Sequence, residues 1–340
     1  MSQIKISILD QSPVRQHGTA GQALQETVQL ARHAEALGYE RFWVSEHHNT
    51  TALAGSAPEV LLAHLAAHTQ TIRLGSGGIM LPNHSALKVA ENFRLLEALA
   101  PGRVDLGIGR APGGDRLTAA LLNPSNRFKE EEYIEQLTDL TAYLNDGLET
   151  SYGKVMAIPE VATAPEMWLL TSSGSSAVFA AGMGMGLAFA QFISPYGAKE
   201  AIALYRARFK PSAAMPEPKV LLAISVLIAD TEPKAQELKA VMQNRLLQLE
   251  RGNRLEGIPA YETIKDIVYT PEEQLVMQRN AGRLIAGTPG QVKAQLLQLA
   301  GDCAVDEIMA VTITHSFEDR LRSYSLLAEM FPQAEPALTV

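Results

Sequence analysis

The sequence predicts an α/β protein folded as a (β/α)8 TIM barrel, with a loop insertion between the seventh and eighth strands. Short apolar runs alternate with amphipathic helical patterns along the chain, and eight strand and helix pairs can be counted. No Ser/Gly-rich linker or repeat divides them. Eight parallel strands with crossover helices close most simply into a barrel, whose usual size of about 250 residues leaves room for loop insertions. A doubly wound open sheet is the alternative.

The strands and helices alternate in a regular order. The strands are predicted at 4–9, 41–48, 72–81, 103–109, 166–173, 186–193, 219–229 and 306–314. A helix between the first two strands presents Leu24, Val28 and Ala31 on one face. Further helices are expected at 57–68, 85–99, 129–144, 175–183, 197–208, from 232 onward, and at 289–300 and 317–331.

The extra length lies mainly at 245–285, between the seventh and eighth strands. This stretch has mixed polarity and several Gly and Pro residues, as expected of a mobile lid. Barrel enzymes place their active sites at the carboxyl ends of the strands, so a lid there would cover the catalytic face. The whole of 1–340 is assigned to one domain that carries this insertion.

Composition excludes several classes of protein. The chain has 37 Asp plus Glu against 29 Lys plus Arg, a formal charge of −8, so nucleic acid and anionic membranes are unlikely partners. Its single cysteine, Cys303, excludes an internal disulfide and a thiolate zinc cluster. No apolar run approaches the roughly 18 residues of a membrane span, and no secretory signal begins the sequence. A cytoplasmic protein is expected.

Polar side chains end the second predicted strand, in "FWVSEHHN". Glu46, His47 and His48 are expected beside the barrel mouth. Side chains alternate along a strand, so His47 should point away from the side that Glu46 and His48 share. The two histidines then have different tasks. They could also satisfy loop carbonyls, or bind a metal with His315 as a third ligand, which would suit a metal-dependent barrel hydrolase.

Glycines interrupt the third and fourth strands, in "LGSGGIMLP" and "VDLGIGRAPGG". Glycine within a strand indicates a bulge or the close approach of a flat group. The second motif fits the dinucleotide fingerprint poorly, because its third glycine falls one position late and Pro112 lies inside the turn. Arg110 at the rim suits an anionic group such as phosphate, and a solvated surface arginine is the alternative.

Serines follow the fifth strand, in "LLTSSGSSAVFAAG". The serines between Ser172 and Ser176 lie between a strand and a helix start, where hydroxyls and free backbone N–H groups can bind phosphate. Capping of the helix by Ser175 would account for only one of them. The later "GMGMG" at 182–186 follows a helix and precedes a strand, the reverse of the order that a phosphate turn needs.

Together these motifs resemble the bacterial luciferase-like flavin monooxygenases, in particular single-chain members that emit no light. The similarity spans almost the whole chain and includes "FWVSEHHN", "LGSGGIMLP", "LLTSSGSSA" and "GTPGQV" in order. The resemblance implies that His47 is the active-site histidine. It also implies that Gly77 and Gly78 are joined by a cis peptide beneath a flavin ring.

The resemblance further implies which residues form the site. Catalysis is expected from His47, with Glu46 and His48 beside it. The FMN-binding residues are expected to be Gly77, Gly78, Arg110, Ser172, Ser173 and Ser176. Two departures from the luciferase catalytic chain are visible: Ser172 replaces a glutamate, and the "APGGD" loop after Arg110 lacks an aromatic residue.

The implied reaction uses reduced FMN and O2 to oxygenate a small organic substrate. His47 would serve proton transfers, for which an ordinary imidazole pKa of about 6.5 is suitable. A separate flavin reductase would supply the reduced FMN. The apolar "SAPEVLLAHLAAH" favours a homodimer. The alternatives are a deazaflavin-dependent hydride-transfer enzyme and a flavin-binding protein without turnover.

Overall fold

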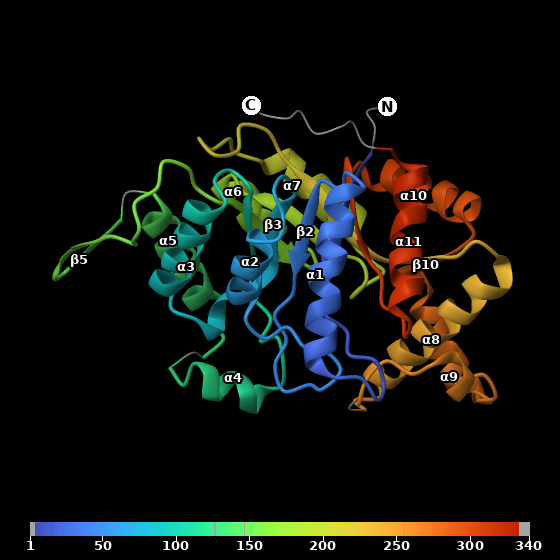
Figure 1. The fold of residues 1–340 in the computed structure, drawn as a ribbon. Coiled ribbons are helices and arrows are strands. Elements are labelled where there is room, and N and C mark those ends of the chain that lie inside the picture. Colours follow the sequence, from blue (N-terminus) through green and yellow to red (C-terminus); the bar gives the residue numbers. More distant parts are fainter. Residues whose placement is uncertain (1–3, 126, 146, 254, 333–340) are drawn as a thin grey trace.

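Eight parallel strands close into a barrel in this computed structural model, which describes residues 4–332 except 126, 146 and 254. The strands pair in the order β1, β2, β3, β4, β7, β8, β9 and β11, and β11 pairs with β1. Helices surround this ring (Figure 1). The closed ring confirms the predicted (β/α)8 barrel and excludes the doubly wound open sheet.

All eight predicted strands are present. They are β1 Lys5–Asp10, β2 Arg41–Val44, β3 Arg73–Met80, β4 Val104–Gly109, β7 Glu166–Thr171, β8 Gly186–Ala190, β9 Val220–Ile228 and β11 Glu307–Val311. The helices that overlap predicted ones are α1 Ala20–Ala36, α2 Pro58–Ala66, α3 Ala86–Leu99, α5 Glu130–Leu144, α6 Ala177–Met183, α7 Ala198–Arg208, α8 Glu232–Glu250, α10 Pro289–Cys303 and α11 Phe317–Met330. Strand β2 is shorter than expected, so "SEHHN" forms a loop.

Several short elements were not predicted. They are α4 Arg116–Leu122, the hairpin of β5 Leu148–Thr150 and β6 Gly153–Val155, β10 Leu284–Gly287, and the 3-10 helices Leu81–Asn83, Tyr261–Thr263 and Ala281–Arg283. The sequence "TPEE" at 270–273 does indicate the start of α9 Pro271–Arg279, where Thr270 and Glu273 form a capping box. Strand β10 pairs with the last residues of β9, beyond the point where β8 ends. The stretch predicted as an insertion at 245–285 therefore begins within α8 and ends within β10.

Buried charges close the amino end of the barrel. Arg41 donates hydrogen bonds to Asp105 and Glu307, at 2.8 and 2.7 Å, and Arg73 also pairs with Asp105. Burial raises the pKa of Asp105, but the charges of Arg41 and Arg73 outweigh burial and lower that pKa. The indole of Trp43 donates to the same carboxylate at 2.9 Å. The charged groups of this end pair with one another, around a cavity of about 310 Å³ that Arg41, Arg73 and Glu307 help to line.

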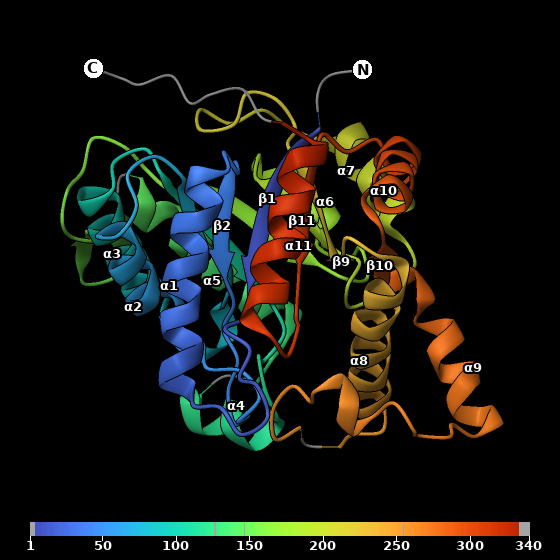
Figure 2. The same ribbon diagram turned by 45° about the vertical axis from the view of Figure 1, so that its right-hand side comes forward.

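The carboxyl end of the barrel carries the irregular segments. Figure 2 shows α4 and the α8–α9 region on either side of the face toward which β1 runs. The loop that contains the histidines also reaches this face, where the backbone N–H of His48 donates to the Gly113 carbonyl at 3.0 Å. No helix among the described residues is long and apolar enough to cross a membrane.

Candidate active site

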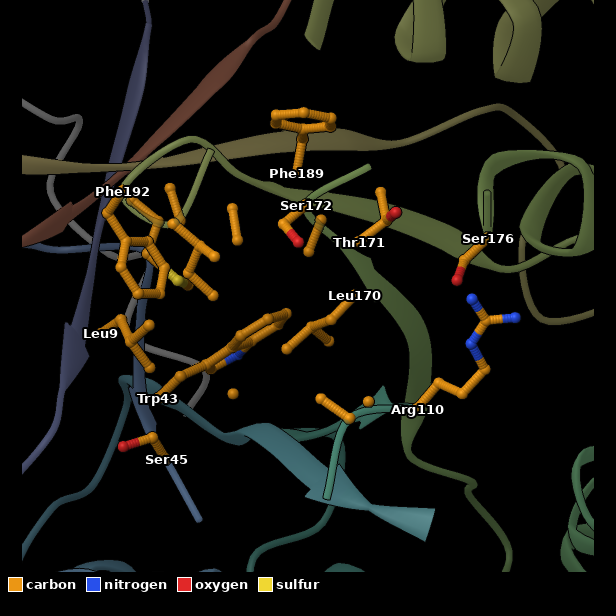
Figure 3. Close-up of a pocket in the computed structure, with 18 of the residues that line it drawn as sticks. Leu9, Trp43, Ser45, Arg110, Leu170, Thr171, Ser172, Ser176, Phe189 and Phe192 are labelled. Atoms are coloured by element: carbon orange, nitrogen blue, oxygen red, sulfur yellow. The ribbon is translucent and has the colours of Figure 1, made fainter. Parts of the chain in front are cut away.

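A cavity of about 330 Å³ lies at the carboxyl end of the barrel. Figure 3 shows its two ends, with Arg110 and Ser176 at one and Leu9, Trp43 and Phe192 at the other. The structure brings together most of the predicted site residues in its wall, namely His47, Gly77, Arg110, Ser172, Ser173 and Ser176. They come from four different strand ends, and the closing of the barrel brings these ends together.

Gly77 and Gly78 form a bulge in β3. The pairing with β4 shifts register between Gly77 and Ile79, and the Gly77–Gly78 peptide bond is cis, as the resemblance implied. A Cβ at Gly77 would lie 2.6 Å from Leu9 Cδ1, and a Cβ at Gly78 would lie 2.6 Å from the Gly107 carbonyl oxygen. A side chain at Gly78 would therefore meet backbone, and one at Gly77 would displace the Leu9 side chain, so the two glycines leave a flat backbone wall at Gly77.

Arg110 and the serines form the polar end of the cavity. The Arg110 guanidinium donates to Glu130 at 2.6 Å and to the Ser175 hydroxyl at 3.3 Å. The Ser173 and Ser175 hydroxyls lie 3.2 Å apart. About a third of the Arg110 side chain is exposed, so it is neither buried in the scaffold nor freely solvated. The guanidinium and the hydroxyls of this cluster can therefore donate hydrogen bonds to the same ligand.

Two further hydroxyls face the cavity with their hydrogen-bonding capacity unused. Ser172 and Ser176 make no side-chain hydrogen bond to the described residues, although Ser176 is only 4% exposed. The residue that caps α6 is Ser176, without a side-chain bond, so the alternative of capping by Ser175 is wrong. Donors held at a cavity wall without a protein partner are suited to a bound anion.

His47 lies in the cavity wall beyond the end of β2. Its Nδ1 lies 3.0 Å from the Ser45 hydroxyl, and its backbone N–H donates to the Gly55 carbonyl at 2.8 Å. Burial, followed by the positive charge of Arg245, lowers the pKa of His47 to about 4, against the opposing charge of Glu46. The pKa of His47 therefore lies below the expected ordinary imidazole value of about 6.5, and its ring stays neutral into mildly acidic pH.

Glu46 points away from the cavity into a hydrogen-bonded cluster. Its carboxylate accepts from the Met80 backbone N–H at 2.8 Å and lies 2.8 Å from His48 Nε2 and 3.0 Å from His84 Nε2. Burial raises the pKa of Glu46, but the hydrogen bonds and charge of these histidines outweigh it and lower that pKa. Glu46 is hydrogen-bonded to His48, whereas His47 alone of the three lines the first cavity. The two histidines thus have different surroundings, as predicted, but strand alternation is not the cause, because β2 ends at Val44.

A second cavity of about 750 Å³ adjoins the first. Residues that line both are Gln11, His47, Phe192 and Ile193. His48 lines the second cavity, whereas His315 lines neither and has its Nδ1 2.9 Å from the Ile258 carbonyl. Within the part of the chain that the structure describes, no group of three or more His, Cys, Asp or Glu side chains could hold a metal ion.

Two residues of the site were not predicted from the sequence. His84, in "PNHSAL" after the third strand, was not considered. Arg245 was assigned to the insertion. A signal for Arg245 existed, because it continues the stripe of Ala235, Leu238 and Met242 at helical spacing and so occupies an inward position of α8.

Comparisons with known proteins show the family of the chain and support its fold. The luciferase-like monooxygenase family model matches residues 4–305. The chain is 51% identical to YwcH of Bacillus subtilis (strain 168), covering 96% of this chain and 99% of that protein. It is 37% identical to the N-acetyl-S-alkylcysteine monooxygenase of the same organism, covering 96% and 98%. The crystal structure of apo-MsnO8 superposes with a TM-score of 0.87 at 37% identity, covering 96% and 98%.

More distant solved structures share the fold. One is the oxygenating constituent of 3,6-diketocamphane monooxygenase from Pseudomonas putida in complex with FMN, with a TM-score of 0.71 at 18% identity, covering 97% of this chain and 98% of that one. An F420-dependent secondary alcohol dehydrogenase has the same TM-score at 12% identity, covering 97% and 100%.

Proposed function

The chain belongs to the luciferase-like monooxygenase family, and from this premise we propose that it uses reduced FMN and O2 to oxygenate a small organic substrate. The observation that supports this most directly is the first cavity. It has a cation and hydroxyls at one end and a flat glycine wall with apolar side chains at the other. FMN has the matching pair of ends, a phosphate and a planar ring.

Arg110, Ser173 and Ser176 would hold the phosphate, with Ser172 and Ser175 beside them. A guanidinium and several hydroxyls together provide charge and directed hydrogen bonds, which phosphate requires. Gly77 and Gly78 would lie under the ring, where a side chain at Gly77 would meet Leu9 and Trp43. The residues present therefore fit FMN at both ends.

When bound, reduced FMN supplies the electrons for reaction with O2. The chain orients the ring and excludes water from the reacting face. His47 is the proposed catalytic residue, because its Nε2 makes no hydrogen bond to the described residues and its ring lines the cavity. As a neutral imidazole, it can donate or accept one hydrogen bond at the reacting atoms.

Glu46 and His48, predicted as catalytic, are proposed to position His47. The cluster of Glu46, His48 and His84 ties the loop after β2 to β3, because Glu46 also accepts from the Met80 backbone. His48 also lines the second cavity. Neither residue is needed at the reacting atoms for this role.

A deazaflavin-dependent hydride transfer is the second candidate. An F420-dependent alcohol dehydrogenase shares the fold, and an arginine rim would also accept the phosphate of that cofactor. FMN is favoured because the N-acetyl-S-alkylcysteine monooxygenase is 37% identical over nearly the whole chain, whereas the F420-dependent structure is 12% identical. A flavin-binding protein without turnover remains the third candidate.

The proposal includes two partners. A separate reductase would supply reduced FMN. The first cavity has one phosphate-binding end, and the sequence shows no second nucleotide-binding motif that could bind a nicotinamide cofactor. A homodimer is proposed through the helices that follow the second and third strands. The cytoplasmic location and the mobility of 245–285 also stay predictions.

A fluorescence titration with FMN, riboflavin and F420 tests the cofactor. Arg110→Ala should weaken FMN binding by roughly 1.5–3 kcal/mol, the range for hydrogen bonds to a charged group, and should change riboflavin binding much less. Arg206→Ala is the matched control, because Arg206 pairs with Asp306 at the other end of the barrel. Equal losses for FMN and riboflavin would contradict the phosphate role, and tighter binding of F420 than of FMN would favour the alternative.

A further inference from the structure

The second cavity is large, and the FMN proposal does not use it. Its volume of about 750 Å³ lies in the range of small-molecule sites. It meets the first cavity at His47, so a molecule bound in it would reach the proposed reacting region. Most of its wall is apolar, with contributions from Phe192, Met242, Leu246, Leu249, Val311 and Ile313.

One wall residue is an arginine without a partner among the described residues. Arg245 on α8 is 8% exposed and makes no hydrogen bond or ion pair to any described residue. Its Nε is fully buried and unsatisfied. The other buried arginines of the described chain have protein partners, because Arg41 and Arg320 pair with carboxylates and Arg94 donates to the Leu144 and Asn145 carbonyls.

An unpaired buried cation is unfavourable for folding. Removing a guanidinium from water costs several kcal/mol unless a carboxylate or carbonyl compensates it. Burial, and then the charge of Arg283, lowers the pKa of Arg245 to about 10, which still leaves it protonated at neutral pH. A group kept in this state without a structural partner is expected to have a functional one.

The other charged groups around the cavity do not neutralise Arg245. Arg283 donates to the Phe192 carbonyl and to Asn280 at 2.8 Å each, and it lies 3.8 Å from Glu250. His48 is held by Glu46. Glu256, the acidic residue of the wall, is exposed and forms no ion pair with Arg245. The cavity interior is therefore cationic.

We propose that the second cavity binds the organic substrate and that Arg245 receives a carboxylate of that substrate. The substrate class is a molecule with an apolar body and one carboxylate, because the wall offers apolar side chains around a single unpartnered guanidinium. The inference rests on the proposed function, in which the flavin ring fills the neighbouring cavity. The carboxylate would then anchor the substrate while the apolar part extends toward His47.

Equilibrium binding of 4-phenylbutanoate and 4-phenylbutanamide to the full-length protein tests this without turnover. The two probes have nearly the same shape and differ in charge. The acid should bind at least about tenfold more tightly than the amide, because a hydrogen-bonded charge pair contributes at least that factor. Arg245→Met should abolish the preference, and Arg245→Lys should keep part of it.

Two matched variants locate the effect. Lys239→Met removes the same charge from α8 outside the cavity wall and should leave the preference intact. Arg110→Ala should also leave it intact, because Arg110 lies at the far end of the first cavity. Equal binding of the two probes to the unmodified protein would overturn the proposal, and so would a preference that survives Arg245→Met or disappears only in Arg110→Ala.

Stability provides a second readout that a structural arginine would not give. Arg245→Met should melt at the same temperature as the unmodified protein or higher, because it removes an uncompensated buried charge. A lower melting temperature would assign Arg245 to the scaffold and contradict the proposal. FMN binding to Arg245→Met should be unchanged. If FMN does not bind even to the unmodified protein, the proposed function fails while the anion preference can still be measured.

Discussion

His47 lies where the two cavities meet, and its charge state depends on both. Burial and the charge of Arg245 keep its ring neutral, with a pKa of about 4. A carboxylate bound at Arg245 would offset that positive charge and raise the pKa of His47 toward its usual value. Substrate binding and proton transfer would thereby be coupled at one side chain.

His47→Gln should leave FMN affinity intact and slow O2-dependent oxygenation of a test aldehyde or ketone about 10²–10⁴-fold, the usual contribution of a general acid or base. Glutamine keeps a hydrogen-bonding side chain but cannot exchange the proton. His64→Gln, an exposed change on α2, is the control. A variant that melts early but turns over normally while folded would assign His47 to the scaffold.

The stability of the same variants depends on pH in a predictable direction. The pKa of His47 is about 4 in the folded protein and about 6.5 when unfolded, so the unfolded chain binds the proton first as pH falls. The stability contributed by neutral His47 is complete above pH 6.5 and lost toward pH 4. The difference in unfolding free energy between the unmodified protein and His47→Gln should shrink over that window. A difference that grows toward pH 4 would contradict the lowered pKa.

Most of the polar side chains that line the first cavity could be predicted, because they belong to short motifs at strand ends. The pKa of His47 could not, because its second cause is Arg245, which belongs to a distant helix and approaches only in the closed barrel. The hydrogen-bonding role of Glu46 could not be predicted from the sequence either. Alternation predicted a position opposite His47, but the hydrogen bonds from His84 and Met80 that hold Glu46 depend on the packing of β3 against β2.

The glycines of β3 and β4 allow two strand backbones to pack closely at the floor of the site. A Cβ at Gly107 would lie 2.1 Å from the Ser76 carbonyl oxygen. Gly107→Ala should therefore destabilise the protein by about 1–3 kcal/mol or more, the cost of overpacking where backbone has to move.

Gly301→Ala in α10 is the control for that substitution. Apart from the backbone of α10 itself and the two neighbouring residues, no atom lies within 4 Å of a Cβ there, so alanine should stabilise the helix by roughly 0.5–1 kcal/mol. Urea denaturation compares the two variants. Equal effects would show that the close approach of β3 and β4 does not restrict residue 107.

The eight strands of the ring were predictable, and several short elements outside the ring were not. Eight apolar runs separated by helical patterns leave few arrangements other than a closed barrel. Strand β10 has four residues, which is too short for a periodic signal, and it forms because β8 ends early and leaves the last part of β9 unpaired. The "GMGMG" motif was correctly set aside, since Gly184 ends α6 in the left-handed region with φ 63°.

In the whole molecule, the buried ion pairs of Arg41 lie at the amino end of the barrel and the two cavities lie at its carboxyl end. The exposed surface of α2 is less apolar than its sequence indicated, because Leu62 and Leu65 are buried in the core. Val60 remains 67% exposed, and Leu95 and Leu99 on the adjoining α3 are 52% and 60% exposed. These side chains are the proposed dimer contact.

Sedimentation at micromolar concentration should give twice the 36.8 kDa of one chain. Val60→Glu with Leu99→Glu should shift the protein to monomers, because charges would be buried without partners. Leu121→Glu, on the equally exposed face of α4, should leave the dimer intact. A monomer in the unmodified protein would count against the predicted homodimer.

The central claim is that this barrel holds reduced FMN for reaction with O2. The most direct measurement mixes the anaerobic protein and reduced FMN with O2 in a stopped-flow spectrophotometer and follows flavin absorbance. We expect bound FMN to reoxidise with kinetics clearly different from free FMN, and Arg110→Ala to return the trace toward that of free flavin at the same concentrations. A trace that matches free FMN at protein concentrations that saturate binding would contradict the account.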